Sequence, residues 1–389
     1  MANNRVYYAI QQVTFGKDSG GAGGTRTAAH GVQSIGITTN FNLEQVFELG
    51  QISIYENVEG TPDVEVTMSK VLDGYIPLYC LATADQTNGP ALSQRVDSDV
   101  KTYVQLGIWD EANQSAGENS STAGSWVEMS GLVVSSVSYN FPLDDNFSED
   151  ITLVGNYKVW KSGTATNTVS TDCGVSYYPS GAAGSFAGNN DAPIGDGGVN
   201  RRENIQFATT TAAAQSGDYT ILPEDIPGVD TSGVKNSAHV SSITVSTDVS
   251  REDIFELGAK LPYAKTVTFP VEVTCDIEVT TASGDLVNAL DDCTDASTCN
   301  TKSNLNERRI RIATCEGLRV WLGQKNKLSS VSYGGGDAGG GNATVTYSYS
   351  NFNDFTIMHS GDVSANGGST DGGTWWTNRE TYIGTGVYY

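Results

Sequence analysis

Carboxylate side chains recur two or four positions apart in one stretch of the sequence, where they alternate with apolar residues. The acids are Glu272, Asp276 and Glu278, and the alternating apolar residues are Val271, Val273, Cys275, Ile277 and Val279. A period of two is typical of a β-strand with one buried face, so the acids share the opposite face. No Lys or Arg interrupts them, and like charges on one face repel by up to about 1 kcal/mol per pair. That face must therefore contact water.

Paired carboxylates are the groups with which glycosidases protonate and attack a glycosidic bond. Here the acids lie on a single strand face without the aromatic cleft that such chemistry uses. We therefore expect no enzyme. Two interpretations of the acidic face stay open, the outer surface of a sheet and the wall of a water-filled channel.

Other residue types with chemical potential also lack the required surroundings. His30 and His239 occupy matching positions in a repeat, but no Cys, His or carboxylate cluster accompanies them as in a metal site. The glycine run 334–341 lacks the Lys-Ser/Thr pair and helix of a phosphate loop, so we expect a hairpin tip. The acidic segment 144–150 lacks the glycine and ligand spacing of a calcium loop, so we expect a solvated acidic loop there. We expect no metal and no cofactor.

The acidic stretch belongs to a unit that the chain contains twice. Phe47-Glu48-Leu49-Gly50 recurs as Phe255-Glu256-Leu257-Gly258, and the segment 34–67 aligns with 242–274 at an offset of 208. One extra residue in the first unit, Asp63, places 64–67 opposite 271–274. The segment 135–139, SSVSY, recurs letter for letter at 329–333. Each half is therefore predicted to contain the same elements in the same order.

Composition favours strands and turns. The chain has 389 residues, enough for two domains, and 44 are glycine. Val, Ile, Thr, Ser and Tyr fill most of the remaining stretches. We predict an all-β protein of two tandem β-sandwich or half-barrel domains, with about one short helix per half. The formal net charge of −23 argues against a surface that neutralises phosphates.

The predicted elements follow these patterns. Strands are expected at 6–15, 34–41, 63–70, 100–109, 126–139, 151–160, 309–321, 328–333 and 343–349. A turn is expected at 42–44, with a second hairpin strand through Phe47–Gly50. Helices are expected at 73–82, capped by Asp73, and at 285–290. Neither a secretory leader nor a membrane span is expected, and the six cysteines do not repeat between the halves, so reduced thiols are expected.

The predicted domains are 1–160 and 200–361. A Gly/Ser/Asn-rich linker and surface excursion is expected at 161–199. The tail at 362–389 is rich in glycine and aromatic residues and is expected to contact another subunit or its own domain.

At Ser250–Gly258 and Pro262–Val279 the sequence resembles the tail tube proteins of tailed bacteriophages, in particular those with a duplicated tube domain. The resemblance is clear over 34–67 and 242–280. It implies domains that stack in rings of six around a lumen, so that three chains complete each ring. It also implies a virion tail protein that assembles in the host cytoplasm. Its partners would be further copies of itself and other tail proteins, such as a terminator, a baseplate or tip protein and a sheath.

The resemblance favours the channel interpretation of the acidic face. An acidic wall would repel a DNA duplex and let it pass without specific binding. The expected lumen-facing acids are Glu272, Asp276, Glu278, Asp248 and Glu65. The repeat signature is expected to form a packing turn and comprises Phe47, Glu48, Leu49, Gly50, Phe255, Glu256, Leu257 and Gly258. The alternative from another class is a β-sandwich binding module, such as an adhesin, a carbohydrate-binding protein or a capsid decoration protein.

Overall fold

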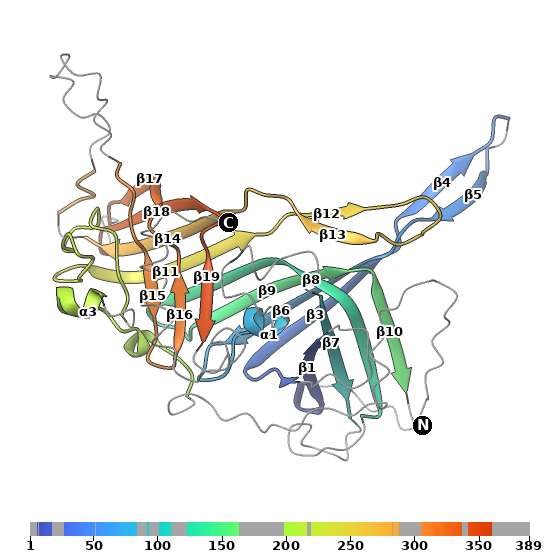
Figure 1. Cartoon of the computed structure of the whole chain (residues 1–389), viewed down its shortest axis with the longest axis horizontal. Coiled ribbons are helices and arrows are strands. Elements are labelled where there is room, and N and C mark those ends of the chain that lie inside the picture. Colours follow the sequence, from blue (N-terminus) through green and yellow to red (C-terminus); the bar gives the residue numbers. More distant parts are fainter. Residues whose placement is uncertain are drawn as a thin grey trace.

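The structure is a computed structural model that describes residues 6, 8–17, 27–50, 52–83, 92, 101–109, 123–162, 198–215, 219–281, 283–287, 305–336 and 341–359. Strands dominate this part of the chain (Figure 1). The described residues include two short α-helices, α1 (Leu78–Ala82) in the first half and α3 (Thr211–Gln215) in the second. The predicted all-β fold class is confirmed.

One antiparallel sheet runs through both halves of the chain. Its strands pair in the order β3, β6, β9, β8, β11, β14, β18, β17. In the first half these strands are β3 (Val32–Asn40), β6 (Asp63–Val71), β9 (Ser148–Gly155) and β8 (Ser125–Pro142). In the second half they are β11 (His239–Asp248), β14 (Glu272–Thr280), β18 (Thr344–Phe352) and β17 (Lys327–Gly334). We call these two groups of four the first unit and the second unit.

Shorter strands form a second layer. The N-terminal part of β8 pairs with β7 (Thr102–Ile108) and β10 (Tyr157–Ser162), and β7 continues to β1 (Gln11–Lys17) and β2 (Thr27–Ala28). In the second half β15 (Arg311–Ala313), β16 (Leu318–Trp321) and β19 (Thr356–His359) form a three-stranded sheet. One hydrophobic cluster includes residues from both layers and both halves. The described residues also form two short 3-10 helices, η1 (Tyr8–Ile10) and η3 (Arg202–Asn204).

The two units share their pairing register, including its irregularities. Each has one β-bulge on its first strand and one on its last. These bulges fall between Val32 and Ser34, Val240 and Ser242, Val134 and Ser136, and Leu328 and Ser330. Because a bulge depends on local sequence and pairing together, its recurrence at matching positions shows that the duplication extends to backbone geometry.

The register corrects the sequence alignment on one strand. Thr39 pairs with Val64 and its equivalent Thr247 pairs with Val273, so Val64 corresponds to Val273. The sequence match had placed Val64 opposite Val271, and that alignment was wrong by two residues. A shift of two leaves every side chain on its original face, so the assignment of faces is unaffected.

The two units are joined edge to edge by one strand pair, which we call the joint. In the joint, β8 of the first unit pairs with β11 of the second over seven residue pairs, from Ser242 opposite Pro142 to Asp248 opposite Ser136. Val137 and Tyr139 from β8 and Val245 from β11 are buried there. The domain boundaries stay a prediction, since 163–197, which make up most of the expected linker, lie outside the described residues.

A two-stranded arm rises from each unit at the same place (Figure 1). The first arm is β4 (Leu43–Phe47) with β5 (Ile54–Glu59), and the second is β12 (Arg251–Ile254) with β13 (Ala264–Val267). Equivalent backbone hydrogen bonds of 3.0 Å close the two bases, from Gly60 N to Asn42 O and from Thr268 N to Ser250 O. The predicted hairpin of 34–41 with the segment through Phe47–Gly50 was wrong, because β3 pairs with β6 instead.

Other boundaries also differ from the sequence prediction. The expected strand 151–160 is two strands, β9 and β10, and the expected strand 309–321 is the β15–β16 hairpin. The expected helix at 73–82 begins only at Leu78, because Asp73 instead accepts a hydrogen bond from Tyr75 N and pairs with Lys70. In the second half, Asp285–Val287 is not helical, and 288–290 lie outside the described residues.

A buried carboxylate explains this difference between the halves. Glu149 on β9 accepts hydrogen bonds from Leu78 N at 2.6 Å, Tyr79 N at 2.9 Å and Tyr139 Oη at 2.8 Å. It thereby satisfies the first amides of α1, and it pairs across the sheet with Lys70. The equivalent cross-strand pair in the second unit is Val279 with Val345. The second unit therefore has no carboxylate to start a helix at this position.

The Glu149 site predicts a pH dependence of stability. Burial raises the pKa of the Glu149 carboxyl above its ordinary value of 4.5, opposed by the Tyr79 amide and the Lys70 charge. A raised folded-state pKa means that Glu149 stabilises the fold most below pH 4.5 and progressively less as the pH rises through the folded-state pKa.

We expect the free energy of unfolding of wild type minus that of Glu149→Gln to fall as pH rises from 4 to 8, by about 1.4 kcal/mol per unit of pKa shift. Urea denaturation of both proteins across this range measures the difference. A difference that grows with pH would show that the fold favours the ionised carboxylate instead.

Candidate functional site

The face of the main sheet opposite the hydrophobic core is mostly polar, with apolar exceptions such as Phe352 and Val154, and we call it the polar face. It arises from the period of two, since on β14 the exposed Glu272 and Asp276 alternate with the buried Val273, Cys275 and Ile277. The same alternation occurs on β6, where exposed Glu65 lies between buried Val64 and Val66. All five acids predicted to share a surface lie on this face.

The register places these acids relative to one another. Asp276 is opposite Thr244 on β11 and Ser348 on β18, and Glu278 is opposite Ser242, whose Oγ lies 3.2 Å from Glu278 Oε2. Asp248 is opposite Ser136 on β8, across the joint. Glu65 is opposite Thr38 on β3, several strands away. The acids are thus spread over the whole face and do not converge on one point.

Two further acids lie on the polar face and were missed from the sequence. Asp150 was assigned to a solvated acidic loop, but it belongs to β9 and faces Ser138 and Ser69 across the sheet. Asp63 begins β6 at the position equivalent to Glu272. The alternation Asp150, Thr152 and Val154 with Glu149, Ile151 and Leu153 was the available signal, and the buried Glu149 obscured it.

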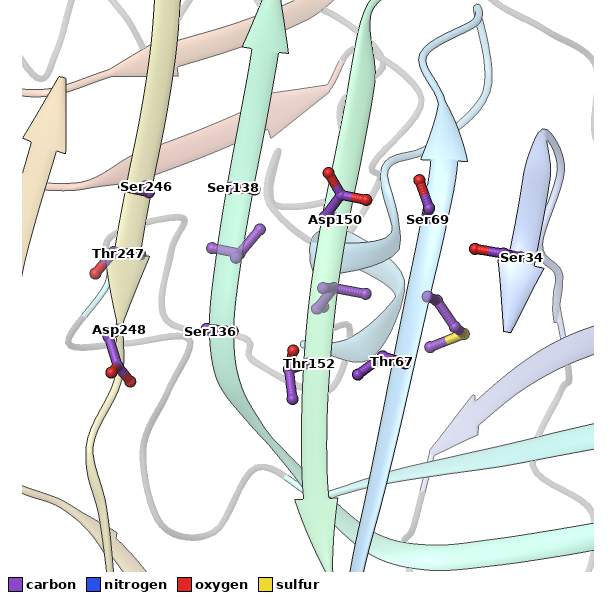
Figure 2. A pocket seen from close by; sticks show the side chains of 13 residues that line it. Ser34, Thr67, Ser69, Ser136, Ser138, Asp150, Thr152, Ser246, Thr247 and Asp248 are labelled. Atoms are coloured by element: carbon purple, nitrogen blue, oxygen red, sulfur yellow. The ribbon is translucent and has the colours of Figure 1, made fainter. Parts of the chain in front are cut away.

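The middle of the polar face is hollowed (Figure 2). A depression of about 500 Å³ extends over β3, β6, β9, β8 and β11 and crosses the joint. Hydroxyl and carboxylate groups form two rows along it. One row contains Ser34, Ser69, Asp150, Ser138 and Ser246, and the other contains Thr67, Thr152, Ser136 and Asp248.

The charge on this face is strongly negative. By register, its acids on the eight strands are Asp63, Glu65, Asp150, Asp248, Glu272, Asp276 and Glu278, and its one lysine is Lys327. The other lysine of these strands, Lys70, is buried on the core side. A surface with this balance repels polyanions and keeps its side chains hydrated.

The remaining candidate residues do not form a reactive site. His30 stacks on Tyr75 with ring centroids 3.8 Å apart, and His239 starts β11. His359 is buried at the end of β19. Within the described ranges no group of His, Cys, Asp and Glu could hold a metal ion. The glycine run follows β17, with Gly334 opposite Thr344, as expected of a hairpin tip, although 337–340 lie outside the description.

The repeat signatures lie at the tips of the two arms. Gly50 and Gly258 adopt φ values of 96° and 94°, which supports the predicted turns. Their apolar neighbours do not pack within the chain, since Leu49 and Leu257 are fully exposed. The tail 362–389 lies outside the described residues, so its expected contacts stay a prediction.

Comparisons with known proteins found similarity among solved structures. No family model matches the chain, and no curated protein matches it. Among solved structures, similarity is found to the anti-feeding prophage cap, a tube terminating cap, with 14% identity, a TM-score of 0.31 and coverage of 42% of this chain and 95% of that chain. In the six-fold symmetrised anti-feeding prophage baseplate, the matching chain has 11% identity, a TM-score of 0.30 and coverage of 42% and 98%.

A third similar structure is the PVC sheath/tube terminator of an extracellular contractile injection system in the extended state. It has 13% identity and a TM-score of 0.31, with coverage of 42% of this chain and 100% of that chain. These similarities are too low to assign a function. In the part of the chain described, no helix is long and apolar enough to span a membrane.

Neighbouring substitutions on β14 should distinguish the two faces. We expect Asp276→Asn to change the free energy of unfolding by less than about 0.5 kcal/mol, because its side chain is exposed. Cys275→Asp should lower it by more than about 2 kcal/mol, because it places a carboxylate in the core, where burial already raises the pKa of the Cys275 thiol. Chemical denaturation measures both. Equal effects would contradict the assigned faces.

Proposed function

We propose that the chain is a non-enzymatic structural subunit of a bacteriophage-type tail tube. Three chains would close edge to edge into a ring of six units, and the polar face would line a lumen that conducts double-stranded DNA. The observation that supports this most is the joint, because it is one unit-to-unit contact of such a ring contained within a single chain.

The two ends of the main sheet have the edges needed to repeat the joint. In the described residues, β3 pairs only with β6 and β17 only with β18, so each leaves one edge unpaired. β3 is the equivalent of β11, and β17 is the equivalent of β8. Open edges with free backbone donors and acceptors recruit further strands. The edge of β17 would therefore pair with β3 of the next chain.

Side-chain burial supports this pairing. Tyr139 on β8 is 0% exposed in the joint, whereas its equivalent on β17, Tyr333, is 54% exposed. Similarly, Val245 on β11 is buried, but its equivalent Ile37 on β3 is only half-buried. Residues that the joint covers inside the chain are thus left open at its two ends. A neighbouring chain would bury them and gain the corresponding hydrophobic free energy.

The internal joint also predicts the register between chains. Ser246 is opposite Ser138, so their equivalents Thr38 and Ser332 should be opposite each other across the interface. The same rule pairs Asn40 with Ser330. Closure by three chains would form a barrel of roughly 24 strands, about 45 Å across between backbones at usual strand spacing and tilt. Such a barrel is wide enough for an aqueous channel.

The acidic wall would act by electrostatics. A basic wall would bind DNA phosphates and release counterions, which would hold the duplex in place. Carboxylates and hydroxyls on the polar face would instead repel the phosphates and keep a layer of water between the wall and the duplex. The DNA could then move without specific contacts.

Disulfide bridging tests the proposed ring contact. We expect Thr38→Cys/Ser332→Cys to form intermolecular disulfides that link up to three chains, because directly opposed cysteines on paired strands meet the required separation. Ser138→Cys/Ser246→Cys is the matched control, since it places the same bridge inside the chain at the joint. Non-reducing electrophoresis separates the products. Links with Thr38→Cys/Ser330→Cys but not with the predicted pair would contradict the register.

Charge reversal tests the role of the acidic face. We expect assembled wild-type tubes to bind no double-stranded DNA at low salt, and Glu272→Lys/Asp276→Lys/Glu278→Lys tubes to bind it with an affinity that falls steeply as salt increases. Filter binding with short duplexes measures this, and electron microscopy verifies assembly. If assembled variant tubes passed and released DNA as wild type does, the electrostatic role would be wrong.

A further inference from the structure

The two arms are equivalent in sequence and pairing but differ in how far they are covered. Every residue of β4 and β5 is exposed, whereas β12 and β13 are mostly half-buried. Figure 1 shows the first arm projecting away from the body, while the second arm lies along the first unit. An isolated two-stranded hairpin is at best marginally stable in water. The first arm therefore lacks a support that the second arm has.

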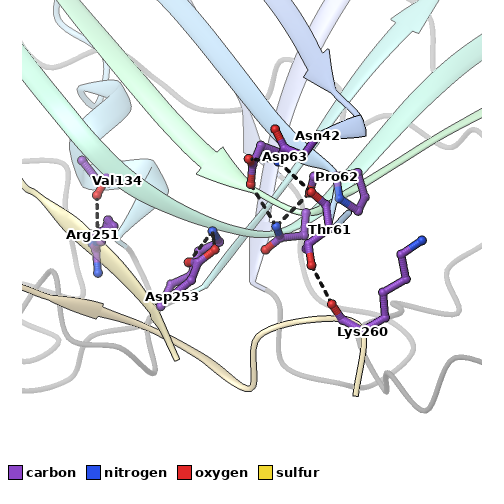
Figure 3. A network of polar contacts seen from close by, with 10 residues as sticks. Asn42, Thr61, Pro62, Asp63, Val134, Arg251, Asp253 and Lys260 are labelled. Carbon is purple, nitrogen blue, oxygen red and sulfur yellow. Dashed lines mark hydrogen bonds and ion pairs between the residues drawn. The ribbon is translucent and has the colours of Figure 1, made fainter. Parts of the chain in front are cut away.

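The first unit supplies the support of the second arm (Figure 3). At the start of that arm, Val249 N donates to Ser135 O at 2.6 Å, and Arg251 Nε donates to Val134 O at 2.8 Å. Further along, Thr61 Oγ1 donates to Lys260 O at 2.7 Å. The second arm is thus held across the joint at two places, one on β8 and one beside the base of the first arm.

The first arm carries apolar side chains where the second carries charged ones. Leu43 and Ile52 occupy the positions of Arg251 and Lys260, and both are exposed. Val46, Phe47, Ile54, Tyr55 and Val58 on the same arm are also exposed. A cluster of exposed apolar residues of this kind marks a surface that another protein covers.

The residues of the first unit that support the second arm have equivalents on the second unit, and two of these equivalents are apolar. On the second unit, Leu328 takes the place of Val134, Ser329 that of Ser135 and Phe269 that of Thr61. Phe269 is about half exposed, whereas Leu328 is buried in the core. The two polar contacts inside the chain are therefore replaced by two apolar pairs, Leu43 with Leu328 and Ile52 with Phe269. In the second pair both members change, since Ile52 replaces Lys260 and Phe269 replaces Thr61. In the first pair only the arm residue changes, because Val134 and Leu328 are both apolar.

We propose that the first arm of each chain lies across the second unit of the neighbouring chain, with Leu43 over Leu328 and Ile52 against Phe269. The partner is a second copy of this chain. In this arrangement Phe41 N donates to the neighbour's Ser329 O, as Val249 N does to Ser135 O within the chain. The arm clamps the strand pairing between chains and buries the apolar residues that are otherwise exposed. This inference rests on the proposed ring.

Cross-linking between two different variants tests the arm contact. Ile52→Cys and Phe269→Cys are made as separate chains, both with the exposed Cys315 changed to Ser, and one carries a tag that alters its mass. The mixed assembly is treated with a short bis-maleimide, so that any mixed product is intermolecular. We expect a tagged–untagged pair between Ile52→Cys and Phe269→Cys, well above the background from the Cys315→Ser parent.

Leu257→Cys is the matched control for position, because Leu257 is as exposed as Ile52 but lies at the tip of the second arm. A stronger product between Ile52→Cys and Leu257→Cys would place the first arm elsewhere and overturn this inference. The Thr38–Ser332 disulfide, measured in parallel, separates the two claims. If that bridge forms and the arm product does not, the arm inference fails and the ring stands; if neither forms, both fail.

Discussion

Backbone pairing across the joint is the contact on which the rest of the architecture depends. It orders seven residue pairs of β8 and β11, continues one sheet through both halves and keeps the polar side chains of both units on one face. It also aligns the hydrophobic residues of both units into one cluster. The equivalent strands recur at the ends of the sheet, so in the proposed ring the contact that stabilises one chain would also be the template for assembly between chains.

The two units differ in their buried polar groups and in their arms. The first unit keeps a buried polar group, Glu149 with Lys70 and Tyr139, which starts α1. The second unit has Val345 and Val279 at the equivalent positions. In the arms it is the second unit that has more charged residues. The ion pair of Asp253 and Lys265 lies on the second arm, which is supported within the chain. Contacts inside the chain can rely on single hydrogen bonds, because their partners are already held together.

Several features could be predicted from the sequence because they depend on local periodicity. The alternation along β14 and β6 placed four of the five acids on one face, and the repeated Phe-Glu-Leu-Gly signature was assigned to turns, which lie at the arm tips. The pairing of β3 with β6 could not be predicted, because the sequence of the arm between them predicts a simple hairpin in which β3 would pair with the segment that directly follows it. The start of α1 also escaped prediction, since it depends on Glu149, about 70 residues away in the sequence. Asp150 was missed because the buried Glu149 next to it obscured the alternation along β9.

In the proposed assembly, free edges of this chain repeat its internal joint until a ring closes. Electron cryomicroscopy of the purified, assembled protein tests it most directly, because it resolves subunit number and strand pairing together. The account predicts rings of three chains in which β17 of each chain pairs with β3 of the next and Glu272, Asp276 and Glu278 face the lumen. Rings of another subunit number, or these acids on the outer surface, would contradict it.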